Sequence, residues 1–362
     1  MDATKPTVVL IGLGRIGAYI ARMLHDSGKY RVVGADINAD LCALTTWPFK
    51  TQAIQPGQYD DVLAGAQAVV SASGFSENPN IAKAALKAGC SYFDLTEDVA
   101  CTQAIKAISA QAESGQVFVP QCGLAPGFVG IVGNSLGKEF DELDTLKLRV
   151  GALPEFPANQ MMYNLTWSTE GLVNEYANPC DAIKQFERTK IEPLEGRETF
   201  SISGVEYEAF NTSGGLGSLC DDLNGKVRDL TYKTIRYPGH CQLMRFLFRD
   251  LRLGEVGPRR DMLMNILDSS VAVTKQDMVL VSVVATGKVD NVLEQKTRSF
   301  LVRHTPEASA IQITTASGLC TVLDLVLSGQ LQGTGFIGQE QIPLDTFLSS
   351  EFAQPYRQAQ LS

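Results

Sequence analysis

The stretch Val8-Val9-Leu10-Ile11-Gly12-Leu13-Gly14-Arg15-Ile16-Gly17 decides the fold of this chain. An apolar, β-branched run leads directly into the pattern G-x-G-x-x-G, and a helical apolar pattern follows over residues 18–24. This order of strand, glycine-rich turn and helix is typical of a dinucleotide-binding βα unit. We therefore predict that a parallel α/β domain begins here.

Each position of this motif has an expected role in holding a dinucleotide. Gly12 permits the tight turn, Gly14 lets a pyrophosphate approach the backbone, and Gly17 lets the helix pack closely on the strand. Backbone N–H groups in the first helical turn, at Arg15 and Ile16, are expected to receive the phosphates. The positive end of the helix dipole favours the same charge.

A second strand-like run, residues 30–35, is followed directly by Asp36, which lies nineteen positions after Gly17. A carboxylate at this point accepts hydrogen bonds from the ribose 2′-OH and repels a 2′-phosphate. We therefore predict NAD rather than NADP as the cofactor. The alternative interpretation is a glycine-rich βα turn that binds nothing.

Strand and helix patterns alternate through the first third of the chain. The predicted strands are residues 51–54, 66–72, 91–95 and 116–120, and the predicted helices are residues 60–65, 80–88 and 101–112. Repeated βα units predict an α/β fold with a doubly wound parallel sheet of Rossmann type, whose ligand lies at the carboxyl ends of the strands. Ser73, Gly74 and Asp94 are therefore expected at the same edge as the Gly12 turn.

The βα rhythm breaks at residues 123–128, which carry two glycines and a proline. Beyond it, the predicted strands are residues 146–151, 200–207, 230–237, 278–286, 297–303 and 310–315, and the predicted helices are residues 129–137, 169–177 and 318–327. These patterns predict a second, mixed α+β domain with a largely antiparallel sheet. The continuous apolar run at residues 278–284 predicts a central strand that is buried on both faces.

The predicted organisation has three parts. A dinucleotide-binding domain occupies residues 1–123, and a substrate and dimerisation domain occupies residues 124–315. A helix and tail, residues 316–362, are expected to return to the first domain. A chain of 362 residues is long enough for two such domains with sizeable cores.

The composition narrows the possible partners. The net charge of −9 argues against nucleic acid or an anionic membrane as a partner, and no run approaches the ~18 apolar residues of a membrane helix. Eight scattered cysteines without a CxxC pair, and no pattern of a signal peptide near the amino terminus, predict reduced thiols in a cytoplasmic protein. Only three histidines are present, so we expect no metal site.

Three later motifs resemble the saccharopine dehydrogenase-like family. They are Gly123-Leu124-Ala125-Pro126-Gly127, Glu208-Ala209-Phe210-Asn211-Thr212-Ser213-Gly214-Gly215 and Tyr232-Lys233-Thr234-Ile235-Arg236-Tyr237-Pro238-Gly239-His240. Within the family they are most similar to the lysine 6-dehydrogenase branch. The resemblance implies an NAD(P)-dependent oxidoreductase that acts at a carbon bearing nitrogen. It also implies a Rossmann domain interrupted by a mixed α/β domain, and often a homodimer.

Two residues are candidates for catalysis. The resemblance places Lys83 on the helix after the fourth strand, where a lysine with a lowered pKa accepts a proton. Asp94, at the end of a strand, is expected to orient Lys83 or to bind the substrate amine. The alternative interpretations are a solvated helix lysine and a carboxylate that caps a turn.

The candidates for binding an amino-acid carboxylate lie in the later motifs. Arginine is the best clamp for a carboxylate, and the resemblance places Arg236 in a turn that faces the cofactor. Thr212, Ser213 and Gly214 form a small polar turn whose backbone N–H groups suit the same group. The alternative for Arg236 is a surface ion pair.

Three further residues are expected near the substrate. His240 is the only histidine inside a motif, and it is either a general acid or base or a hydrogen-bonded loop histidine. Tyr163 is expected to add a polar contact. Cys122 is expected to pack against the nicotinamide pocket rather than to act as a nucleophile.

The leading hypothesis is an NAD-dependent amino-acid or imine dehydrogenase that binds its substrate between two domains. The alternative is an NAD(H)-binding sensor or scaffold on the same fold, because Ala125 and Asn211 stand where related branches carry titratable groups. A third possibility keeps the enzyme class and takes a secondary-amine, opine-type imine as substrate.

Overall fold

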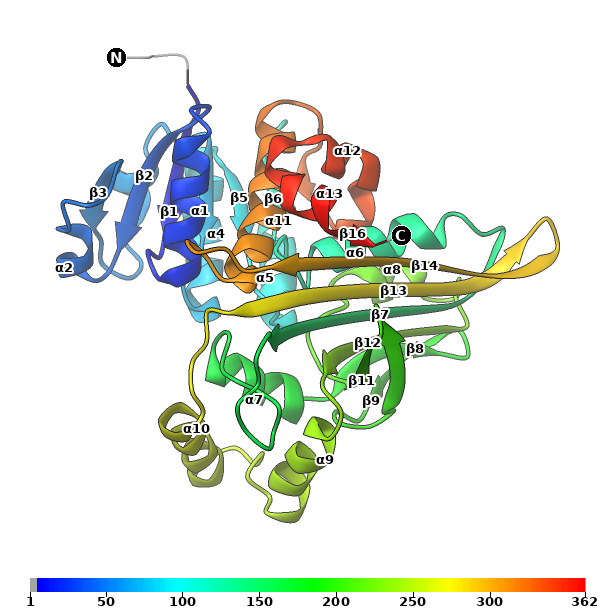
Figure 1. Cartoon of the computed structure of the whole chain (residues 1–362). Helices are drawn as coiled ribbons and strands as arrows, with labels where there is room; N and C mark the ends of the chain where they lie inside the picture. Colours follow the sequence, from blue (N-terminus) through cyan, green and yellow to red (C-terminus); the bar gives the residue numbers. More distant parts are fainter. Residues whose placement is uncertain (1–4, 362) are drawn as a thin grey trace. The chain divides into compact units, whose positions relative to one another are not determined.

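The computed structural model describes residues 5–361, which form two compact units (Figure 1). Unit 1 comprises the chain up to Phe128 together with Thr314–Pro355, and unit 2 comprises Val129–Ile313 together with the residues from Tyr356 onward. We expected the whole tail to return to the first domain. Its last residues instead belong to unit 2, because strand β16 (Gln360–Leu361) pairs with β14 (Val292–Arg303).

Unit 1 is built on a parallel sheet. Within the described residues its strands are β1 (Thr7–Ile11), β2 (Arg31–Asp36), β3 (Lys50–Ala53), β4 (Ala68–Ser71), β5 (Ser91–Asp94), β6 (Val117–Val119) and β15 (Gly335–Phe336). Their order is β15-β6-β5-β4-β1-β2-β3, and every neighbouring pair is parallel. The strand order reverses at β1, where an open α/β sheet binds its ligand. The predicted doubly wound Rossmann-type sheet is confirmed.

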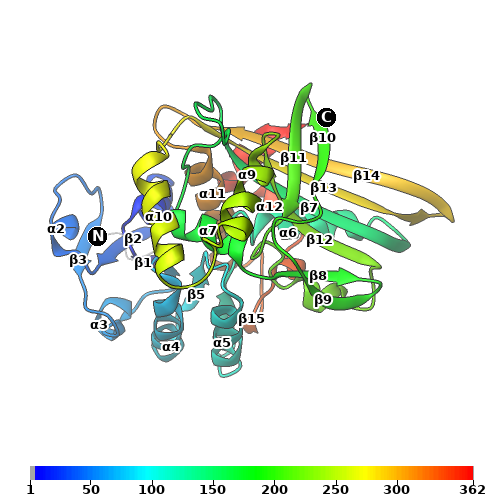
Figure 2. The same ribbon diagram turned by 90° about the horizontal axis from the view of Figure 1, so that it is seen from below.

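Helices flank this sheet. They are α1 (Arg15–Asp26), α2 (Ala39–Cys42), α3 (Asp60–Leu63), α4 (Asn78–Ala88), α5 (Val99–Ser109), α12 (Leu344–Ser349) and the larger part of α11 (Ala310–Leu327). Figure 2 shows α3, α4 and α5 in a row. Pro79 stands in the first turn of α4, and Gly89 ends the helix in the left-handed conformation.

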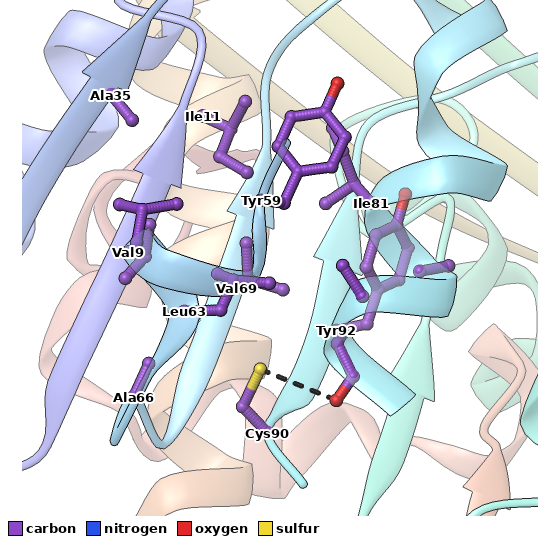
Figure 3. Close-up of a cluster of buried hydrophobic side chains, with 14 of the residues drawn as sticks. Val9, Ile11, Ala35, Tyr59, Leu63, Ala66, Val69, Ile81, Cys90 and Tyr92 are labelled. Atoms are coloured by element: carbon purple, nitrogen blue, oxygen red, sulfur yellow. Dashed lines mark hydrogen bonds between the residues drawn. The ribbon is translucent and has the colours of Figure 1, made fainter. Parts of the chain in front are cut away.

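The apolar side chains between this sheet and its helices form one continuous core. Val9, Val69 and Tyr92 project from three neighbouring strands and meet Ile81 of α4 and Leu63 of α3 (Figure 3). All of them are buried. The core explains the near-continuous hydrophobic runs of these strands, because a parallel sheet is covered on both faces.

Unit 2 is built on a mixed, mostly antiparallel sheet. Its strands include β7 (Glu142–Pro154), β8 (Cys180–Lys184), β9 (Glu187–Ile191), β10 (Glu198–Ile202), β11 (Val205–Asn211), β12 (Asp229–Arg236) and β13 (Asp277–Val289). Their main order is β10-β11-β12-β7-β13-β14-β16, with only β12 and β7 parallel along this path. The long strands β7, β13 and β14 run side by side (Figure 1). The predicted central strand is confirmed, because β13 lies between β7 and β14.

Unit 2 also contains helices. They are α6 (Phe128–Gly137, whose first residue lies in unit 1), α7 (Thr169–Ala177), α8 (Leu219–Leu223), α9 (His240–Arg245) and α10 (Pro258–Ser270). Helix α7 has the predicted bounds, because Ser168 accepts a hydrogen bond from Gly171 N–H and caps its first turn. The sequence patterns did not predict α8, α9 or α10.

The strand predicted at residues 310–315 is wrong. Helix α11 already begins at Ala310. The β-branched residues in this stretch suggested a strand, yet Ser309 and Gln312 cap one another reciprocally. Asp277 of β13 also accepts hydrogen bonds from the N–H groups of Ala310 and Ile311. These caps satisfy the first turn of the helix.

The single strand predicted at residues 200–207 is a hairpin. Strands β10 and β11 pair in antiparallel register and are joined by Ser203 and Gly204. Both turn residues have positive φ angles, +51° and +80°. Two left-handed residues in succession are typical of the tight turn that matches the twist of a hairpin.

Helix α11 is the one helix in the described chain that is long and apolar enough to cross a membrane by length and composition. Of its apolar stretch, 72% is buried inside the protein. That burial is typical of a core helix. Gly318 supports this interpretation, since a Cβ there would lie 2.3 Å from the carbonyl oxygen of Gly123.

Candidate functional site

The glycine-rich turn has the geometry of a phosphate-binding turn. A Cβ at Gly12 would lie 2.6 Å from the carbonyl oxygen of Ala72, and one at Gly17 would lie 1.9 Å from that of Gly12. At Gly14, by contrast, an added Cβ would meet no described atom within 4 Å. Two glycines are therefore required by the protein's own packing, whereas the space at Gly14 is left open for a ligand.

The first turn of α1 follows this open space. Gly14 is its N-cap, and no side chain of the described residues makes a capping hydrogen bond there. Arg15 is exposed and Ile16 is half-buried. A helix start without a side-chain cap leaves backbone N–H groups for an anion. The residues present therefore fit a dinucleotide phosphate.

Asp36 lies at the end of β2, beside the turn. Its Oδ2 accepts a hydrogen bond from Leu13 N–H at 2.6 Å, and its Oδ1 accepts one from Asn38 N–H at 2.8 Å. These two bonds fix the carboxylate against the glycine-rich turn. Each oxygen keeps a second lone pair, so the group can still accept from ribose hydroxyls.

Ser73 and Gly74 follow β4 at the same edge, as predicted from the strand order. Ala72, which precedes Ser73, donates its N–H to the carbonyl of Ile11. The hydroxyls of Ser71 and Ser73 are 2.9 Å apart, and Ser71 donates to Oδ1 of Asn78 at 2.7 Å. The Gly12 turn and the Ser73 turn are thus neighbours within unit 1.

Asp94 is part of a buried network and is not presented to a ligand. Its carboxylate accepts from Asn78 Nδ2 and Tyr92 OH, and from the backbone N–H groups of Thr96 and Gln121. Burial raises the pKa of Asp94 to about 6. Four donors from unit 1 occupy both oxygens, which supports the alternative interpretation of a carboxylate that holds the strand ends together.

Cys122 is buried next to Asp94 and has a structural role as well. Its thiol donates to the carbonyl oxygen of Asp94 at 3.2 Å, and burial raises its pKa well above the usual value. A thiol of this kind is neither a nucleophile nor a polar contact for a substrate. The prediction that Cys122 contacts the substrate gains no support from this geometry.

Lys83 lies on α4, the helix after the fourth strand, as the resemblance implies. It is exposed on α4, on the same helical face as Asn80 and Lys87, whereas Ile81, Ala82 and the other buried residues of α4 face the core. Helical periodicity carries position 83 away from the sheet. The position corresponds to the alternative interpretation of a solvated helix lysine.

The sequence patterns missed Glu97, which lies three residues beyond the end of β5. Its side chain is half-buried. Burial, and then the negative charge of Asp98, raise the pKa of Glu97 to about 7. A carboxyl group with such a pKa at the ligand-binding edge of an α/β sheet is a candidate acid or base. The signal in the sequence was an acid in the short segment between a strand of the sheet and the next helix.

The residues expected to bind the substrate carboxylate come together in unit 2. Arg236, at the end of β12, is only 2% exposed, and its guanidinium lies 5.1 Å from the ring centroid of Tyr163 and 5.9 Å from that of Tyr176. No carboxylate among the described residues lies within ion-pair distance of it. The charge of Glu175 acts on Arg236 from beyond ion-pair distance. A buried cation without a directly paired anion is costly, so this arrangement is typical of a site that receives one.

A hydrogen-bond chain connects Arg236 with His240. Arg236 Nε donates to the hydroxyl of Tyr176 at 2.9 Å, and that hydroxyl lies 3.1 Å from Nε2 of His240. His240 Nδ1 lies 2.9 Å from the carbonyl oxygen of Met161. A carbonyl only accepts, so we assign the proton of His240 to Nδ1, and Nε2 accepts from Tyr176.

This chain favours one of the two interpretations of His240. Burial, followed by the charge of Arg236, lowers the pKa of His240 to about 3. The imidazole is therefore neutral at physiological pH, with both nitrogens occupied. It corresponds to the alternative interpretation of a hydrogen-bonded histidine.

The polar turn after β11 is anchored to the end of α7. Ser213 donates its N–H to the carbonyl of Glu175 and its hydroxyl to the carbonyl of Asn174. Gly214 has a φ of +92°. The hydroxyls of Thr212 and Tyr163 are buried and make no hydrogen bond within residues 5–361. These two hydroxyls are therefore candidate donors to a ligand.

Sequence reasoning also missed Tyr176 and Glu208. Tyr176 belongs to the buried face of α7, where an apolar pattern hides its polar role. Glu208 is completely buried on β11 and accepts hydrogen bonds from the N–H groups of Gly239 and Cys241. A glutamate next to Ala209 and Phe210 in a strand was the available signal. Among residues 5–361, no group of three or more His, Cys, Asp or Glu side chains is placed to hold a metal ion.

Comparison with protein families identifies two domains along the chain. Residues 8–119 match the saccharopine dehydrogenase NADP binding domain, and residues 123–359 match the saccharopine dehydrogenase C-terminal domain. The chain belongs to the saccharopine dehydrogenase family. The family resemblance drawn from the three motifs is confirmed. Unit 1 therefore carries the family's nicotinamide-dinucleotide-binding fold.

Solved structures show the same fold. The apo saccharopine dehydrogenase (L-Glu forming) of Saccharomyces cerevisiae is 15% identical, with a TM-score of 0.80 over 99% of each chain. An engineered D-amino acid dehydrogenase bound to NADP+ is 12% identical, with a TM-score of 0.53 over 97% of this chain and 98% of that one. The DAP dehydrogenase of C. glutamicum in complex with DAP is 10% identical, with a TM-score of 0.50 over 97% of this chain and 98% of that one. At these identities the likeness shows a shared fold.

Proposed function

We propose that this protein is a dehydrogenase that transfers hydride between a nicotinamide dinucleotide and the C–N carbon of an amino acid or its imine. The family and the phosphate-binding turn support the cofactor. The buried, unpaired Arg236 carries the proposal for the substrate, because an amino acid brings the carboxylate that this guanidinium lacks. The solved structures named for amino-acid dehydrogenases share the fold and are consistent with this class.

We propose NAD as the preferred cofactor. Asp36 is held beside the glycine-rich turn by Leu13 and Asn38, so a 2′-phosphate would meet a fixed negative charge. The next residue, Ile37, is apolar and exposed.

The residues of this chain have separate tasks in the proposed reaction. When bound, the nicotinamide supplies or accepts the hydride. Arg236 fixes the substrate carboxylate, and the hydroxyls of Thr212 and Tyr163 add donors. Glu97, at the ligand-binding edge of unit 1, is the proposed proton acceptor of the reaction, because its raised pKa matches neutral conditions. Asp94 keeps the ends of β5 and β6 in place.

A sensor or scaffold that binds the dinucleotide without turnover is the second candidate. Asn211 favours the sensor or scaffold. Its side chain donates to the carbonyl of Glu192 and so has a structural role, at a position where related branches carry a titratable group. Ala125 likewise offers no acid or base. This candidate shares the cofactor site with the first and differs in the reaction alone.

The test combines binding with turnover. Thermal unfolding is followed with NADH and with NADPH, and the absorbance at 340 nm is then followed with NAD⁺ and a panel of amino acids, and with NADH, ammonia and 2-oxo acids. A Tm raised by NADH supports the cofactor site, because a ligand of the folded state stabilises it. An amine-dependent change at 340 nm supports the dehydrogenase. Binding of NADH with no turnover across the panel would favour the sensor.

A further inference from the structure

Glu208 and Arg236 face each other across neighbouring strands without pairing. The antiparallel register of β11 and β12 places them directly opposite, so their side chains lie on the same face of the sheet. Both are buried, with exposed fractions of 0% and 2%. Two opposite charges in this arrangement ordinarily form an ion pair, yet their polar atoms bind other groups.

The carboxylate of Glu208 accepts hydrogen bonds from backbone N–H groups at the start of α9. Its Oε1 accepts from Cys241 N–H at 2.6 Å, and its Oε2 accepts from Gly239 N–H at 3.2 Å. Arg197, an exposed side chain, adds a contact to Oε2 at 3.4 Å. The carboxylate therefore fixes the turn that carries His240, the first residue of α9.

His240 in turn fixes the hydroxyl of Tyr176. Because Nδ1–H donates to Met161, Nε2 is available only as an acceptor, and the Tyr176 hydroxyl must donate to it. The oxygen of that hydroxyl then presents a lone pair to Arg236 Nε–H. Tyr163, Phe210 and Arg236 are the other groups whose rings or charge lie against this imidazole. None of them is an acid.

We propose that Glu208, His240 and Tyr176 form a positioning relay that keeps Arg236 unpaired and aims one edge of its guanidinium at the substrate carboxylate. Nε is occupied by Tyr176, and one Nη1 hydrogen is occupied by the carbonyl of Ile235 at 2.9 Å. The Nη2 hydrogens and the second Nη1 hydrogen make no hydrogen bond within residues 5–361. A carboxylate is therefore bound end-on, through Nη1 and Nη2, and the side-on mode through Nε is closed.

The identity of the carboxylate as that of a substrate rests on the proposed function, whereas the relay rests on the hydrogen bonds among these side chains. The three side chains of the relay touch neither cofactor nor substrate. All three act on binding of the carboxylate, so their loss is expected to raise KM and to leave kcat nearly unchanged. A general acid or base at His240 would instead lower kcat and remove a limb of its pH profile.

The relay itself is tested without any substrate. Nitrogen-15 spectra of the histidine rings are recorded in the full-length protein between pH 4.5 and 8, and His25→Gln and His304→Gln assign the other two signals. The expected result is a neutral His240 that is protonated at Nδ1 across this range. A His240 that titrates near pH 6.5, or that carries its proton on Nε2, would overturn the relay.

The effect on the carboxylate is tested with glutarate and its diamide as probes. Trp47→Phe leaves Trp167, which packs with Tyr163 in the same cluster, as the only tryptophan and fluorescent reporter. In this background Tyr176→Phe is expected to weaken glutarate binding roughly tenfold to a hundredfold, because a hydrogen bond to a charged group is lost. His240→Leu is expected to do the same. His240→Gln, whose amide oxygen replaces Nε2, is expected to stay within about threefold of the parent.

The outcomes separate the two proposals. If glutarate does not bind while the histidine spectra are as expected, the relay stands and the substrate class is wrong. If glutarate binds and Tyr176→Phe and His240→Leu bind it as tightly as the parent, the relay is wrong and the substrate class stands. Thermal unfolding of each variant accompanies the titration, and affinity is compared only among variants that remain folded. The diamide is expected to bind to none of them.

Discussion

A Cβ added to Gly17 would lie 1.9 Å from the carbonyl oxygen of Gly12, so the last glycine of the motif is required for α1 to pack on its own turn. The middle glycine differs. The space in front of Gly14 holds no described atom within 4 Å, and its φ of −64° is accessible to any residue. The motif therefore divides into two glycines that serve the fold and one that serves a ligand.

Alanine substitutions at these positions are expected to separate folding from binding. Gly17→Ala forces α1 away from the turn, and we expect it to cost at least about 3 kcal/mol of the free energy of unfolding. Gly14→Ala is expected to fold with a Tm within about 2 °C of the parent. It should weaken NADH binding at least roughly tenfold, because the methyl group occupies the approach of the pyrophosphate. Denaturant unfolding and NADH fluorescence measure the two effects, and tight NADH binding by Gly14→Ala would contradict the assignment.

Replacing Asp36 tests the cofactor preference. In Asp36→Ser the fixed negative charge is gone, and we expect the ratio of kcat/KM for NADPH over NADH to rise roughly tenfold, about 1.4 kcal/mol. The N–H groups of Leu13 and Asn38 lose a partner, so a loss of about 1 kcal/mol of stability accompanies the change. An unchanged ratio would mean that the carboxylate does not face the ribose.

The proton acceptor is tested by a matched pair of variants. We expect Glu97→Gln to lower kcat by about a hundredfold or more and to remove the limb of the pH profile near 7, since general base catalysis contributes that much. Lys83→Ala is the control, and we expect its kcat, KM and pH profile to match the parent because the side chain lies on the exposed face of α4. The opposite pattern would restore Lys83 as the base.

The lowered pKa of His240 predicts how stability depends on pH. Below pH 6.5 the unfolded chain protonates this histidine, whereas the folded protein takes up that proton only near pH 3. The unfolded state thus binds more protons, and stability falls as the pH drops through this window. At pH 4.5 the loss is about 2–3 kcal/mol, from about 1.4 kcal/mol per pH unit. His240→Gln should lose that much less than the parent between pH 6.5 and 4.5, as measured by denaturant unfolding at each pH. Parallel curves for the two proteins would rule out a buried neutral histidine.

Local patterns predicted most of the fold. The strand, turn and helix at residues 7–26 and helix α7 stand where the sequence placed them, because a glycine motif and an N-cap mark their ends. The hairpin turn at Ser203 and Gly204 was missed, because strand-forming residues lie on both sides of it and the whole stretch has the composition of a single strand. Helix α11 was cut short because part of its cap, Asp277, is distant in sequence.

The candidate site was harder to predict for a different reason. Arg236, Tyr163 and His240 come together in unit 2, yet their roles depend on two further residues. Tyr176 is hidden in the apolar pattern of α7, and the motif that contains Glu208 indicates no role for that residue. The direction of a helical side chain also matters. Lys83 was placed on the correct helix, and only the burial of the opposite face shows that it points to solvent.

Strand β15 belongs to the sheet of unit 1 but is synthesised after most of unit 2. It pairs with β6 at the edge of the parallel sheet, although residues 129–313 separate unit 1 into two stretches of chain. A growing chain on the ribosome therefore exposes the edge of β6 until unit 2 has been made. An unpaired strand edge recruits other chains. A fragment that stops at residue 128 is thus expected to aggregate, and an expression plasmid for the dinucleotide-binding unit must join its two stretches with a linker.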